Sequence, residues 1–513
     1  MIVTIDRGEP DIIIPCEGTY PYVRGGVSSW IAQLIAGLPQ YNFGIVFLGS
    51  RHSDYAEKPL YPFADNMVFM VELFMFDDEE KLSVKPNNGN PKNFKKVEEL
   101  YQWFKSTQEE KDFPSQLQNL DFYLKEIPEP EFLFSREAWY FIENKYNENC
   151  SDASFLDYFW TVRSIHAPIW KVVQLAKFVE NKGKIIHSPS TGYAGFLATL
   201  VSQSTNKPYI LTEHGIYTKE RKIDLISSSL RLYKKADLFR TSLEDNYFQM
   251  MWVRFFEGIG KMSYRRANPI LSLFGVAKET QIAYGADERR CTVIPNGVDI
   301  ERLGATLKNR PEGIPKVITL IGRVVSIKDI KTFIRAIRVT ANVIPDVEAW
   351  VVGPDDEEED YAQECRELID ILDVGENIKF LGFQNIAEIL PKSGLQTLTS
   401  ISEGMPLVIL EGFAAGVPCV ATDVGSCSEL ILGGENPEDK ALGEAGSICQ
   451  IANVEQLSSA YIEFLTNEEK WYKAQKAAIE RVNKFYTQDI FLENYKNVYE
   501  KTFATLEESS WQE

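Results

Sequence analysis

Short apolar runs alternate with amphipathic stretches along most of the chain, and this alternation predicts an α/β fold. The first apolar run, at 11–16, leads into a glycine-containing loop and then a stretch at 28–37 with apolar residues at helical spacing. Another apolar run follows at 43–50. Strand, glycine loop, helix and strand in this order predict the opening of a doubly wound α/β domain.

The pattern changes between about residues 52 and 160, where charged and aromatic residues replace evenly spaced apolar runs. The segments 97–111 and 136–148 have amphipathic helical patterns, and PNNGNPKN at 86–93 is typical of a flexible joint. We expect a mainly helical insertion over 52–160 in the first domain, with a separate small domain as the alternative. Its aromatic side chains are expected to lie in its core: Trp103, Phe104, Trp139, Tyr140 and Phe141.

Strand patterns resume after the insertion, at 184–190, 209–214, 237–242 and 291–298. RPEGIPKV at 310–317 contains three turn-forming residues and predicts a linker to a second domain.

A second series of apolar runs and amphipathic stretches then begins with KVITLIGRV. The sequence therefore predicts two Rossmann-like doubly wound domains facing a cleft, with ligands at the carboxyl ends of the strands. We expect one such domain over 1–309 and a second, ligand-binding domain over 310–485. A C-terminal helix over 486–513 is expected to pack back across the domains.

Composition narrows the class of protein. The 513 residues carry a formal net charge of −20, which argues against a nucleic-acid-binding protein because such a surface must neutralise phosphates. The seven cysteines are scattered without a C-x-x-C pair and the four histidines are widely separated, so no zinc site is expected. The N-terminal segment does not resemble a signal peptide, and no apolar stretch approaches membrane-spanning length. We therefore expect a cytoplasmic protein.

Four groups of residues fall at predicted strand ends or helix starts, where a ligand would be bound. The first is Gly25-Gly26, which lets the backbone approach a ligand just before a helix whose free N–H groups attract anions. A simple tight turn is the alternative. The second is the pair Arg323 and Lys328, which follows a predicted strand and suits a diphosphate. Two solvated loop charges are the alternative interpretation.

The third group is the segment SEGMPLVILE at 402–411. A proline favours the first turn of a helix, so a helix is expected to begin near Met405, with the N–H groups of Leu407 and Val408 free for phosphate. Glu411, one turn into this helix, can accept hydrogen bonds from vicinal hydroxyls. Glu403 on the preceding loop can reach a further part of the ligand, or can serve as a helix-capping carboxylate.

The fourth group centres on His214, which ends a predicted strand and precedes a glycine. A single histidine is more often a structural residue than a catalyst, and His187 is a weaker example of the same case. Glu213 and the run at 219–221 are expected to line the mouth of the same ligand site as His214. The acidic run GPDDEEEDY at 353–361 is interpreted as helix-start acids on a solvated loop, so no metal site is predicted.

Together these pieces resemble the retaining family 4 glycosyltransferases, which have the GT-B architecture. The matching residues are RGGV (24–27), HG (214–215), PNGVD (295–299), GR with the later lysine (322–328) and E-x7-E (403–411). The resemblance is nearest to the cytosolic transferases of Pel exopolysaccharide synthesis. The stretches that carry it are EGTYPYVRGGVSSW, TEHGIYTKER and GRVVSIKDIKTFIRA.

The resemblance implies a role for each matching residue. Arg323 and Lys328 would bind the donor diphosphate and stabilise the leaving nucleotide, Glu411 would hold the ribose, and Glu403 would contact the donor sugar. Gly25 and Gly26 would approach the distal phosphate, and His214 would lie beside the reacting sugar. The complete donor-binding set would be Gly25, Gly26, Arg323, Lys328, Glu403, Gly404, Met405, Leu407, Val408 and Glu411.

The resemblance also implies the role of each domain, with 1–309 on the acceptor side and 310–485 binding the nucleotide sugar, and it implies the substrates and partners. The donor would be UDP-glucose or a related UDP-hexose, the acceptor a growing polysaccharide, and neither a metal nor another cofactor would be needed. Retention would proceed by same-face attack without a protein nucleophile. The protein would dock on an inner-membrane polysaccharide synthase complex and bind no nucleic acid.

Three other functions remain open at this point. A sugar-nucleotide epimerase or hydrolase of the same architecture would release a free or epimerised sugar. A non-catalytic sugar-nucleotide sensor or scaffold could dispense with Arg323, Lys328 and His214, which are all present. An NAD-dependent dehydrogenase would carry a G-x-G-x-x-G after a strand, and no predicted strand is followed by one.

Overall fold

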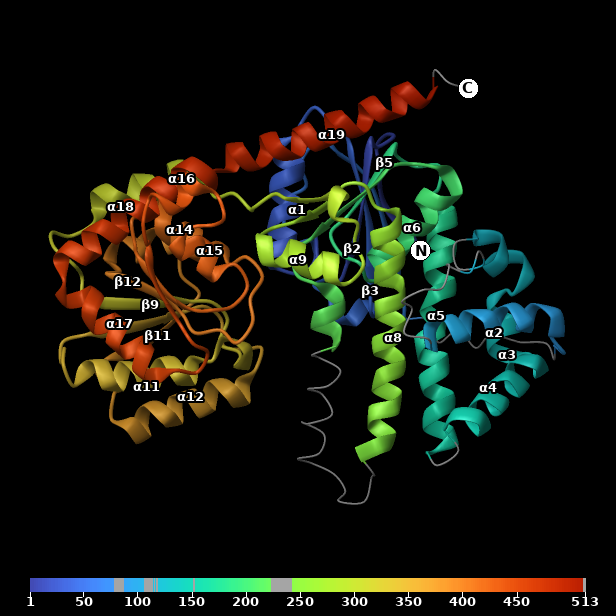
Figure 1. Cartoon of the computed structure of the whole chain (residues 1–513), viewed down its shortest axis with the longest axis horizontal. Helices are drawn as coiled ribbons and strands as arrows, with labels where there is room; N and C mark the ends of the chain where they lie inside the picture. The colour runs from blue at the N-terminus through green and yellow to red at the C-terminus, as the bar shows by residue number, and fades with distance from the viewer. Residues whose placement is uncertain are drawn as a thin grey trace. The chain divides into compact units, whose positions relative to one another are not determined.

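The computed structural model of the chain describes residues 1–77, 87–105, 114, 116, 119–150, 153–222 and 242–510. Most of the predicted strand at 237–242, and residues 106–111 of the predicted helix at 97–111, lie outside these described residues. The chain divides into two compact units, which are drawn in Figure 1. The first unit comprises Met1–Leu271, Glu279–Thr292 and Lys496–Glu513, and the second comprises Ser272–Lys278 and Val293–Tyr495.

The first unit is built on an eight-stranded sheet with the order β1-β4-β3-β2-β5-β6-β7-β8. Its strands are β1 (Ile2–Asp6), β2 (Ile12–Glu17), β3 (Phe43–Gly49), β4 (Met67–Phe74), β5 (Ile185–Ser188), β6 (Tyr209–Glu213), β7 (Ile270–Ser272) and β8 (Cys291–Val293). The strands from β4 to β6 pair in parallel, whereas β1 pairs antiparallel with β4 at the edge. The strand order reverses direction between β2 and β5, so a crevice is expected at their carboxyl ends.

The sequence pattern missed three of these strands, namely β1, β4 and the three-residue strand β7. Strand β1 is an edge strand, and Ile2 and Val3 are about half exposed, so it lacks the continuous buried run that identifies a central strand. Strand β4 lies inside the predicted insertion at 52–160, where seven of its eight residues are buried. Its apolar run was obscured by the charged and aromatic residues on both sides.

The helices of the first unit cover the sheet and form the insertion. They are α1 (Gly26–Gly37), α2 (Pro91–Lys105), α3 (Glu129–Phe134), α4 (Arg136–Asn149), α5 (Phe155–Val179), α6 (Tyr193–Thr205), α8 (Ser242–Arg266) and α9 (Gly275–Ala283), of which α9 continues into the second unit. A π-helical segment spans Phe122–Glu126, and short 3-10 turns span His52–Asp54 and Glu288–Arg290. In Figure 1, α2, α3 and α4 lie together beside the long helices α5 and α8.

The expectation that the aromatic residues of the insertion lie in its core holds only in part. Trp103 is buried, and Phe104 and Phe141 pack against the core. Trp139 and Tyr140 are 48% and 40% exposed, so the expectation was wrong for them. They lie on α4, whose buried positions include Ala138 and Ile142 instead, because a short amphipathic helix buries only one face.

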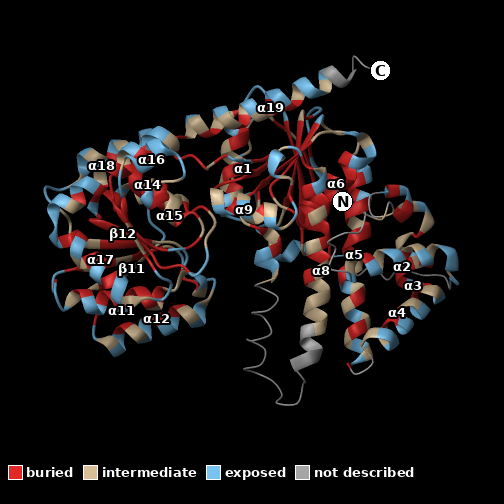
Figure 2. Cartoon of the chain, in the orientation of Figure 1, coloured by how far each residue is buried: buried red, intermediate tan, exposed pale blue. Residues whose placement is uncertain are grey.

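The second unit is a six-stranded parallel sheet with the order β11-β10-β9-β12-β13-β14. Its strands are β9 (Val317–Ile321), β10 (Glu348–Val352), β11 (Ile378–Gly382), β12 (Leu395–Leu398), β13 (Cys419–Thr422) and β14 (Gly446–Cys449). The order again reverses, here between β9 and β12, which places a second switch point at their carboxyl ends. Figure 2 shows most strands of both sheets in the buried class.

The helices of the second unit follow the predicted alternation. They are α10 (Ile300–Gly304), α11 (Ile330–Ala341), α12 (Glu359–Leu372), α13 (Ile386–Ile389), α14 (Leu407–Ala414), α15 (Cys427–Leu432), α16 (Pro437–Lys440), α17 (Val454–Thr466), α18 (Glu468–Phe485) and α19 (Gln488–Ser510). Short 3-10 turns span Ala305–Asn309, Ser326–Lys328 and Leu390–Lys392. Helix α10 packs on α14, and the long segment of the second unit begins at Val293, before the linker predicted at 310–317.

The last helix, α19, belongs to both units. Its first turns lie in the second unit, where Phe491 is buried beside Gly297. The part from Lys496 onward lies in the first unit, where the Tyr499 hydroxyl is 2.7 Å from Nδ1 of His187. This helix therefore contributes side chains to both cores.

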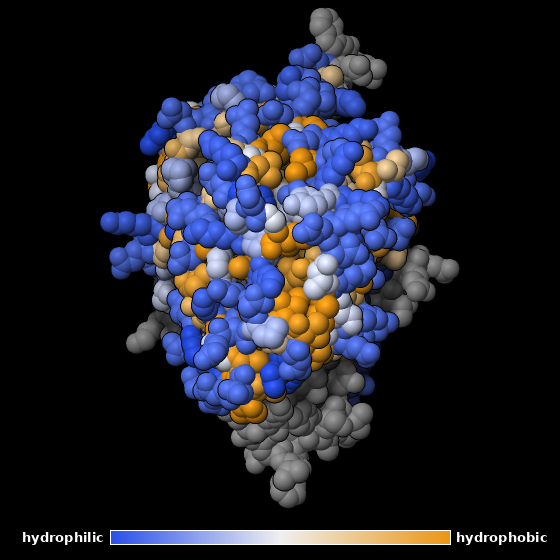
Figure 3. All heavy atoms as spheres, turned by 90° about the vertical axis from the view of Figure 1, so that its left-hand side faces the viewer, coloured by the Kyte–Doolittle hydropathy of each residue, from blue (hydrophilic) through white to orange (hydrophobic). Residues whose placement is uncertain are grey.

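The surface drawn in Figure 3 is largely hydrophilic, with hydrophobic residues gathered in separate patches between the charged ones. Among the described residues, no helix combines the length and the apolar character needed to cross a membrane.

Candidate functional site

The switch point of the second sheet gathers most of the predicted donor-binding residues. Arg323 follows β9 directly, and Lys328 ends the 3-10 turn after it. Glu403 lies on the loop after β12, which is the neighbour of β9 in the sheet. Lys328 and Glu403, which are 75 positions apart in sequence, are therefore adjacent because the carboxyl ends of parallel strands meet at one edge.

Lys328 and Glu403 form an ion pair that the sequence did not predict. The distance from Nζ of Lys328 to Oε1 of Glu403 is 2.5 Å, and the two side chains are only 19% and 13% exposed. The Ser400 hydroxyl donates a hydrogen bond of 2.6 Å to the same carboxylate oxygen. This pairing fixes the ammonium group at the crevice, where it can meet an anionic ligand, and it neutralises a charge that would otherwise be costly to bury.

Arg323 is more exposed and has a different partner. Its guanidinium forms an ion pair with Glu357, 2.5 Å away, and each side chain is about half exposed. Glu357 belongs to the acidic run at 353–361. The adjacent Glu358 accepts hydrogen bonds from the backbone N–H and the hydroxyl of Ser326, at 3.0 and 3.2 Å. The acidic run therefore holds the loop that carries both cations.

The loop before α14 is fixed by close backbone contacts. The carbonyl of Gly404 accepts a hydrogen bond of 2.9 Å from the N–H of Ser426. A Cβ on Gly425, which has a φ of +56°, would lie 2.2 Å from that carbonyl oxygen, so this position requires glycine. The sulfur of Met405 lies 3.3 Å from the backbone N–H of Asn296, in the PNGVD motif. The PNGVD motif therefore packs against this loop.

Helix α14 begins at Leu407, with Pro406 as its N-cap residue. The proline thus lies one position before the first turn in which it was expected. The N–H groups of Leu407 and Val408 are the first two of the helix and have no intrahelical acceptor. They are available to an anion at the same edge of the sheet as Lys328.

Glu411 lies on α14 with a partly buried side chain, and burial raises the pKa of its carboxyl group, while Arg302 opposes the rise. Among the described residues, no hydrogen-bond donor contacts its carboxylate. A buried acid without such a donor is costly unless a ligand supplies one. Its position therefore fits a carboxylate that accepts hydrogen bonds from ligand hydroxyls.

The switch point of the first sheet opens into a cavity of about 460 Å³. Its lining comes from the ends of β2, β3, β5 and β6 and from α8, and it includes His214, Glu220 and Arg221. Glu213 does not line it. Its carboxylate instead accepts hydrogen bonds from Thr191, Tyr264 and Gln281, and burial raises its pKa to about 7. The prediction that Glu213 faces the mouth was wrong, because alternate residues of a strand point to opposite faces.

His214 is a partly buried, neutral imidazole that lines this cavity. Burial lowers its pKa to about 3, and its Nε2 has no hydrogen-bond partner among the described residues. Its ring contacts Trp30 edge to face, with 4.7 Å between the ring centroids. His187 is satisfied instead, with ring nitrogens 2.7 Å from the hydroxyls of Tyr499 and Thr212. An unsatisfied ring nitrogen at a cavity is available to a ligand hydroxyl.

Gly25 and Gly26 are exposed at the start of α1. A Cβ on either residue would meet no protein atom within 4 Å. The φ of Gly25 is 168°, an extended conformation that any residue can adopt. Packing within the protein therefore does not require glycine at either position, which leaves open space for a ligand.

Sequence reasoning missed Glu17, which lines the same cavity at the end of β2. The Tyr217 hydroxyl donates a 2.7 Å hydrogen bond to Oε1, and the N–H of Ala194 donates one of 3.3 Å to Oε2. Burial raises the pKa of Glu17. A Cβ on Gly192 would lie 2.4 Å from Oε2, so this glycine lets the carboxylate reach the start of α6. The signal was an acidic residue directly after the first predicted strand.

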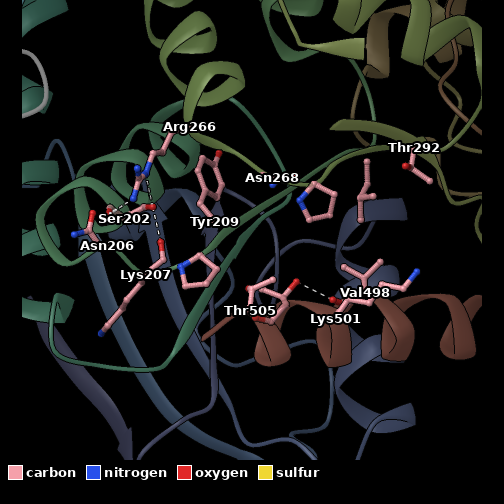
Figure 4. Close-up of a pocket in the computed structure, with 14 residues that line it drawn as sticks. Ser202, Asn206, Lys207, Tyr209, Arg266, Asn268, Thr292, Val498, Lys501 and Thr505 are labelled. Carbon is pink, nitrogen blue, oxygen red and sulfur yellow. Dashed lines mark hydrogen bonds between the residues drawn. The ribbon is translucent and has the colours of Figure 1, made fainter. Parts of the chain in front are cut away.

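A second cavity of about 500 Å³ lies at the opposite end of β6, near its first residue, Tyr209 (Figure 4). Its polar groups largely bind one another. Arg266 donates to the hydroxyl and the carbonyl of Ser202, and the Thr505 hydroxyl donates to the carbonyl of Thr502. Because ligands of such sheets bind at the carboxyl ends of the strands, this cavity is the weaker candidate.

Within the described part of the chain, no group of three or more histidine, cysteine, aspartate or glutamate residues is arranged to hold a metal ion.

Two Rossmann-like sheets, each with polar side chains at its switch point, define a protein of the GT-B fold. The fold is similar to that of HepE from Anabaena, described in complex with UDP and glucose, with a TM-score of 0.57 and 14% identity over 96% of this chain and 99% of HepE. It is also similar to sucrose-phosphate synthase from Thermosynechococcus elongatus, with a TM-score of 0.55 and 15% identity over 96% and 99% of the two chains.

The chain belongs to the family described as a domain of unknown function, DUF3492, whose model matches residues 10–289. Residues 307–482 match the family described as glycosyl transferases group 1, so the second unit contains such a domain. That match covers Arg323, Lys328, Glu403 and Glu411.

Two curated relatives resemble parts of the chain. The N-acetyl-alpha-D-glucosaminyl L-malate synthase of Bacillus anthracis is 31% identical over 26% of this chain. The UDP-Gal:alpha-D-GlcNAc-diphosphoundecaprenol alpha-1,3-galactosyltransferase of Escherichia coli is 30% identical over 33% of this chain. The chain spans 33% and 44% of the lengths of these two relatives, respectively.

Proposed function

We propose that this protein is a retaining glycosyltransferase that transfers a hexose from a nucleotide-sugar donor to a growing exopolysaccharide. The observation that carries the proposal is the group of side chains at the switch point of the second sheet. There a buried Lys328–Glu403 pair lies beside the free start of α14, and Glu411 on that helix lacks a hydrogen-bond donor among the described residues. The match of this unit to glycosyl transferases group 1 supports the same conclusion.

Each group has a distinct task in donor binding. Lys328, Arg323 and the N–H groups of Leu407 and Val408 carry the positive charge that a diphosphate needs on several oxygens. As the glycosidic bond to the leaving phosphate breaks, negative charge grows on that phosphate, and the fixed ammonium of Lys328 stabilises it. Glu411 accepts hydrogen bonds from the ribose hydroxyls.

The two carboxylate oxygens of Glu403 have different roles. Oε1 is engaged by Lys328 and Ser400, which fixes the carboxylate, and Oε2 can accept a hydrogen bond from the transferred sugar. Gly404 and Met405 hold the backbone of this loop. On the first unit, the neutral imidazole of His214 can hydrogen-bond a sugar hydroxyl, and Gly25 and Gly26 leave the backbone open to the distal phosphate.

The donor is proposed to be UDP-glucose or a related UDP-hexose. The Escherichia coli relative is named for UDP-Gal, and HepE, which shares the fold, is described with UDP and glucose. Arg323, Lys328 and the start of α14 take the place of a metal in charge neutralisation, so the reaction is proposed to be metal-independent. In same-face attack the leaving phosphate accepts the proton of the acceptor hydroxyl, and no protein nucleophile is required.

The particular role proposed is that of PelF, the cytosolic transferase of Pel exopolysaccharide synthesis, docked on an inner-membrane synthase complex. The stretches that support it are 17–30, 212–221 and 322–336, and two of them contribute residues to the cavity of the first unit.

The test is a panel of UDP-, GDP- and ADP-sugars, measured by thermal shift and by release of the nucleotide. We expect that only the UDP compounds stabilise the protein. We also expect that the Glu411→Gln and Arg323→Ala variants fold normally but no longer transfer sugar to polysaccharide. Undiminished transfer in either variant would contradict the assignment of that residue. Stabilisation by GDP- or ADP-sugars instead would overturn the choice of base.

Product analysis separates the alternatives. A new glycosidic bond supports a transferase, whereas free or epimerised sugar would identify a hydrolase or an epimerase. Tight donor binding without turnover in the assembled complex would identify a sensor or scaffold. The Glu411 carboxylate, which can accept hydrogen bonds from a ligand, fits an enzyme and a sensor equally well. The Lys328–Glu403 pair favours the transferase, because a leaving phosphate needs a fixed cation.

A further inference from the structure

The cavity shown in Figure 4 lies at the amino-terminal end of β6, within the first unit, and has no role in the proposed reaction. Its lining comes from the ends of α6 and α8, the residues that open β6 and β7, strand β8 and helix α19. The α19 residues lie at helical spacing on one face of that helix, namely Val498, Lys501, Thr502 and Thr505. The volume of about 500 Å³ falls within the roughly 300–1,000 Å³ typical of small-molecule sites.

The described lining of this cavity contains three cations and no acid. The cations are Lys207, Arg266 and Lys501, and none of the described lining residues is an aspartate or a glutamate. The whole chain has a net charge of −20, so the cavity differs in sign from the protein around it. A ligand responds to the charges nearest to it, and these charges attract an anion.

Arg266 is the cation best suited to bind that anion. Its Nε and Nη2 donate to the hydroxyl and the carbonyl of Ser202, at 2.8 and 2.9 Å, and both of these acceptors are neutral. Within the described part of the chain it forms no ion pair with a carboxylate, and burial lowers its pKa. A guanidinium has five N–H donors, of which Ser202 engages only two, and its planar shape suits a phosphate group. A partly buried cation of this kind is stabilised when a ligand supplies the missing anion.

The other two cations add to the positive field. Nζ of Lys207 donates to the carbonyls of Glu180 and Lys182, at 2.6 and 2.9 Å, so its hydrogen bonds also go to neutral oxygens. Lys501 is exposed, and no hydrogen bond or ion pair engages its ammonium group among the described residues. In Figure 4 it lies on α19, away from Arg266. We therefore expect Lys501 to attract the ligand without contacting the same group as Arg266.

The neutral polar side chains of the lining suit the hydroxyls of a sugar. Asn206 and Asn268 are exposed, and their amides make no hydrogen bond within the part of the chain that the structure describes. An amide both donates and accepts, as a sugar hydroxyl does. Tyr209 is the single aromatic residue in the described lining, and it is only 2% exposed. A nucleotide base would find no exposed ring to stack on, so the lining favours a sugar phosphate over a nucleotide.

We propose that this cavity binds a sugar phosphate, with Arg266 binding the phosphate group and the amides of Asn206 and Asn268 binding sugar hydroxyls. The inference goes beyond the proposed function and does not depend on it, because the cavity lies at the end of β6 opposite to the carboxyl end. A ligand there would contact α19 as well as the residues that open β6. Binding should therefore stabilise the first unit and reduce the local opening of α19.

The test uses the full chain, saturated with UDP so that the proposed donor site is filled. Calorimetric titrations compare glucose 1-phosphate and glucose 6-phosphate with glucose, inorganic phosphate and AMP. We expect at least one sugar phosphate to bind more tightly than the other three compounds, because only a sugar phosphate uses both the cation and the amides. Hydrogen exchange measured by mass spectrometry should show protection in peptides that cover 202–209 and 496–505. High salt should weaken the binding.

Charge variants locate the site. In Arg266→Gln the affinity for the sugar phosphate should fall about 10- to 100-fold, which is the loss typical of a hydrogen bond to a charged group. Lys501→Glu changes an exposed side chain, so it should fold as the wild type does. It should lower the affinity about 2- to 30-fold, because it replaces a screened attraction with a repulsion of similar size. Lys92→Glu makes the same charge change at an exposed lysine outside the lining, and this matched control should bind as the wild type does.

Several results would overturn the assignment of the cavity. The first is that neither sugar phosphate binds. The second is that inorganic phosphate or AMP binds at least as tightly as the sugar phosphates, which would show that the sugar is not recognised. Unchanged affinity in both Arg266→Gln and Lys501→Glu, or an equal loss in Lys92→Glu, would show that the ligand binds elsewhere.

Discussion

The ion pair between Arg323 and Glu357 yields a quantitative prediction about donor binding. In the proposed function, the guanidinium of Arg323 binds the donor diphosphate, but in the protein without ligand it is paired with Glu357. The donor must therefore compete with this carboxylate. Replacing Glu357 with glutamine removes the competing charge and keeps the size of the side chain, so donor affinity should rise.

The exposure of the pair sets the size of the effect. The side chains of Arg323 and Glu357 are 54% and 51% exposed, so solvent screens their attraction. Ion pairs of this kind contribute about 0.2–1 kcal/mol, which corresponds to a UDP dissociation constant about 1.4 to 5 times lower in Glu357→Gln. The gain should shrink in high salt, because a solvent-exposed attraction is screened.

Calorimetric titration with UDP at low and high ionic strength measures this effect. The matched control is Glu438→Gln, which breaks another half-exposed ion pair in the same unit, with Lys484 at 2.7 Å. Unchanged or weaker UDP binding in Glu357→Gln would refute the competition. An equal gain in Glu438→Gln would show that only the net charge of the protein matters.

Further predictions follow from four positions in the chain. Burial raises the pKa of Glu411, so this carboxylate should become protonated, and donor affinity should fall, at a higher pH than for an ordinary glutamate. A titration of UDP affinity against pH should show this fall in the wild type and not in Glu411→Gln. The same raised pKa means that the contribution of Glu411 to stability is present at low pH and is lost as pH rises through the folded pKa, so Glu411→Gln should melt no lower than the wild type at neutral pH. Arg481 is fully buried and bound by Asp439, so Asp439→Ala should lower the free energy of unfolding by about 3–5 kcal/mol in urea titrations, and a loss under 1 kcal/mol would contradict this role. Gly26→Ala should leave the melting temperature unchanged but slow sugar transfer, since the added Cβ meets no protein atom, and normal transfer would remove Gly26 from the donor site. The pKa of His214 is lowered to about 3, so the pH profile of transfer should lack a step near pH 6.5, whereas His214→Ala should transfer more slowly.

Much of the fold could be read from the sequence because central strands of parallel sheets are continuous apolar runs. The strands β2, β3 and β9 to β13 lie where such runs occur. Two successive α/β series of similar size predicted two Rossmann-like domains, and the resemblance to the family 4 glycosyltransferases implied the GT-B class. The edge strand β1 and the embedded strand β4 could not be read in this way, because neither stands out from its surroundings as a bounded apolar run.

The boundary between the units is a second case in which local signals were insufficient. The turn-forming residues at 310–317 mark a real bend, but α10 precedes them and packs on α14. Which sheet a short helix covers depends on contacts made more than a hundred residues away. Turn chemistry alone carries no information about those contacts.

The segment SEGMPLVILE illustrates the division between sequence and structure. The sequence by itself determined that a loop, a proline and a helix start occur together there, with one carboxylate before the helix and one within it, because these are local properties of the backbone. Only the tertiary structure decided what those carboxylates contact. The strand order joined Glu403 to Lys328 across neighbouring strands and left Glu411 partly buried without a hydrogen-bond donor among the described residues. It likewise paired Arg323 with Glu357, and it placed Glu17 in a cavity with His214. Such pairings are set by which strand ends become neighbours in the sheet, and strand order depends on the burial of the whole chain rather than on any one segment.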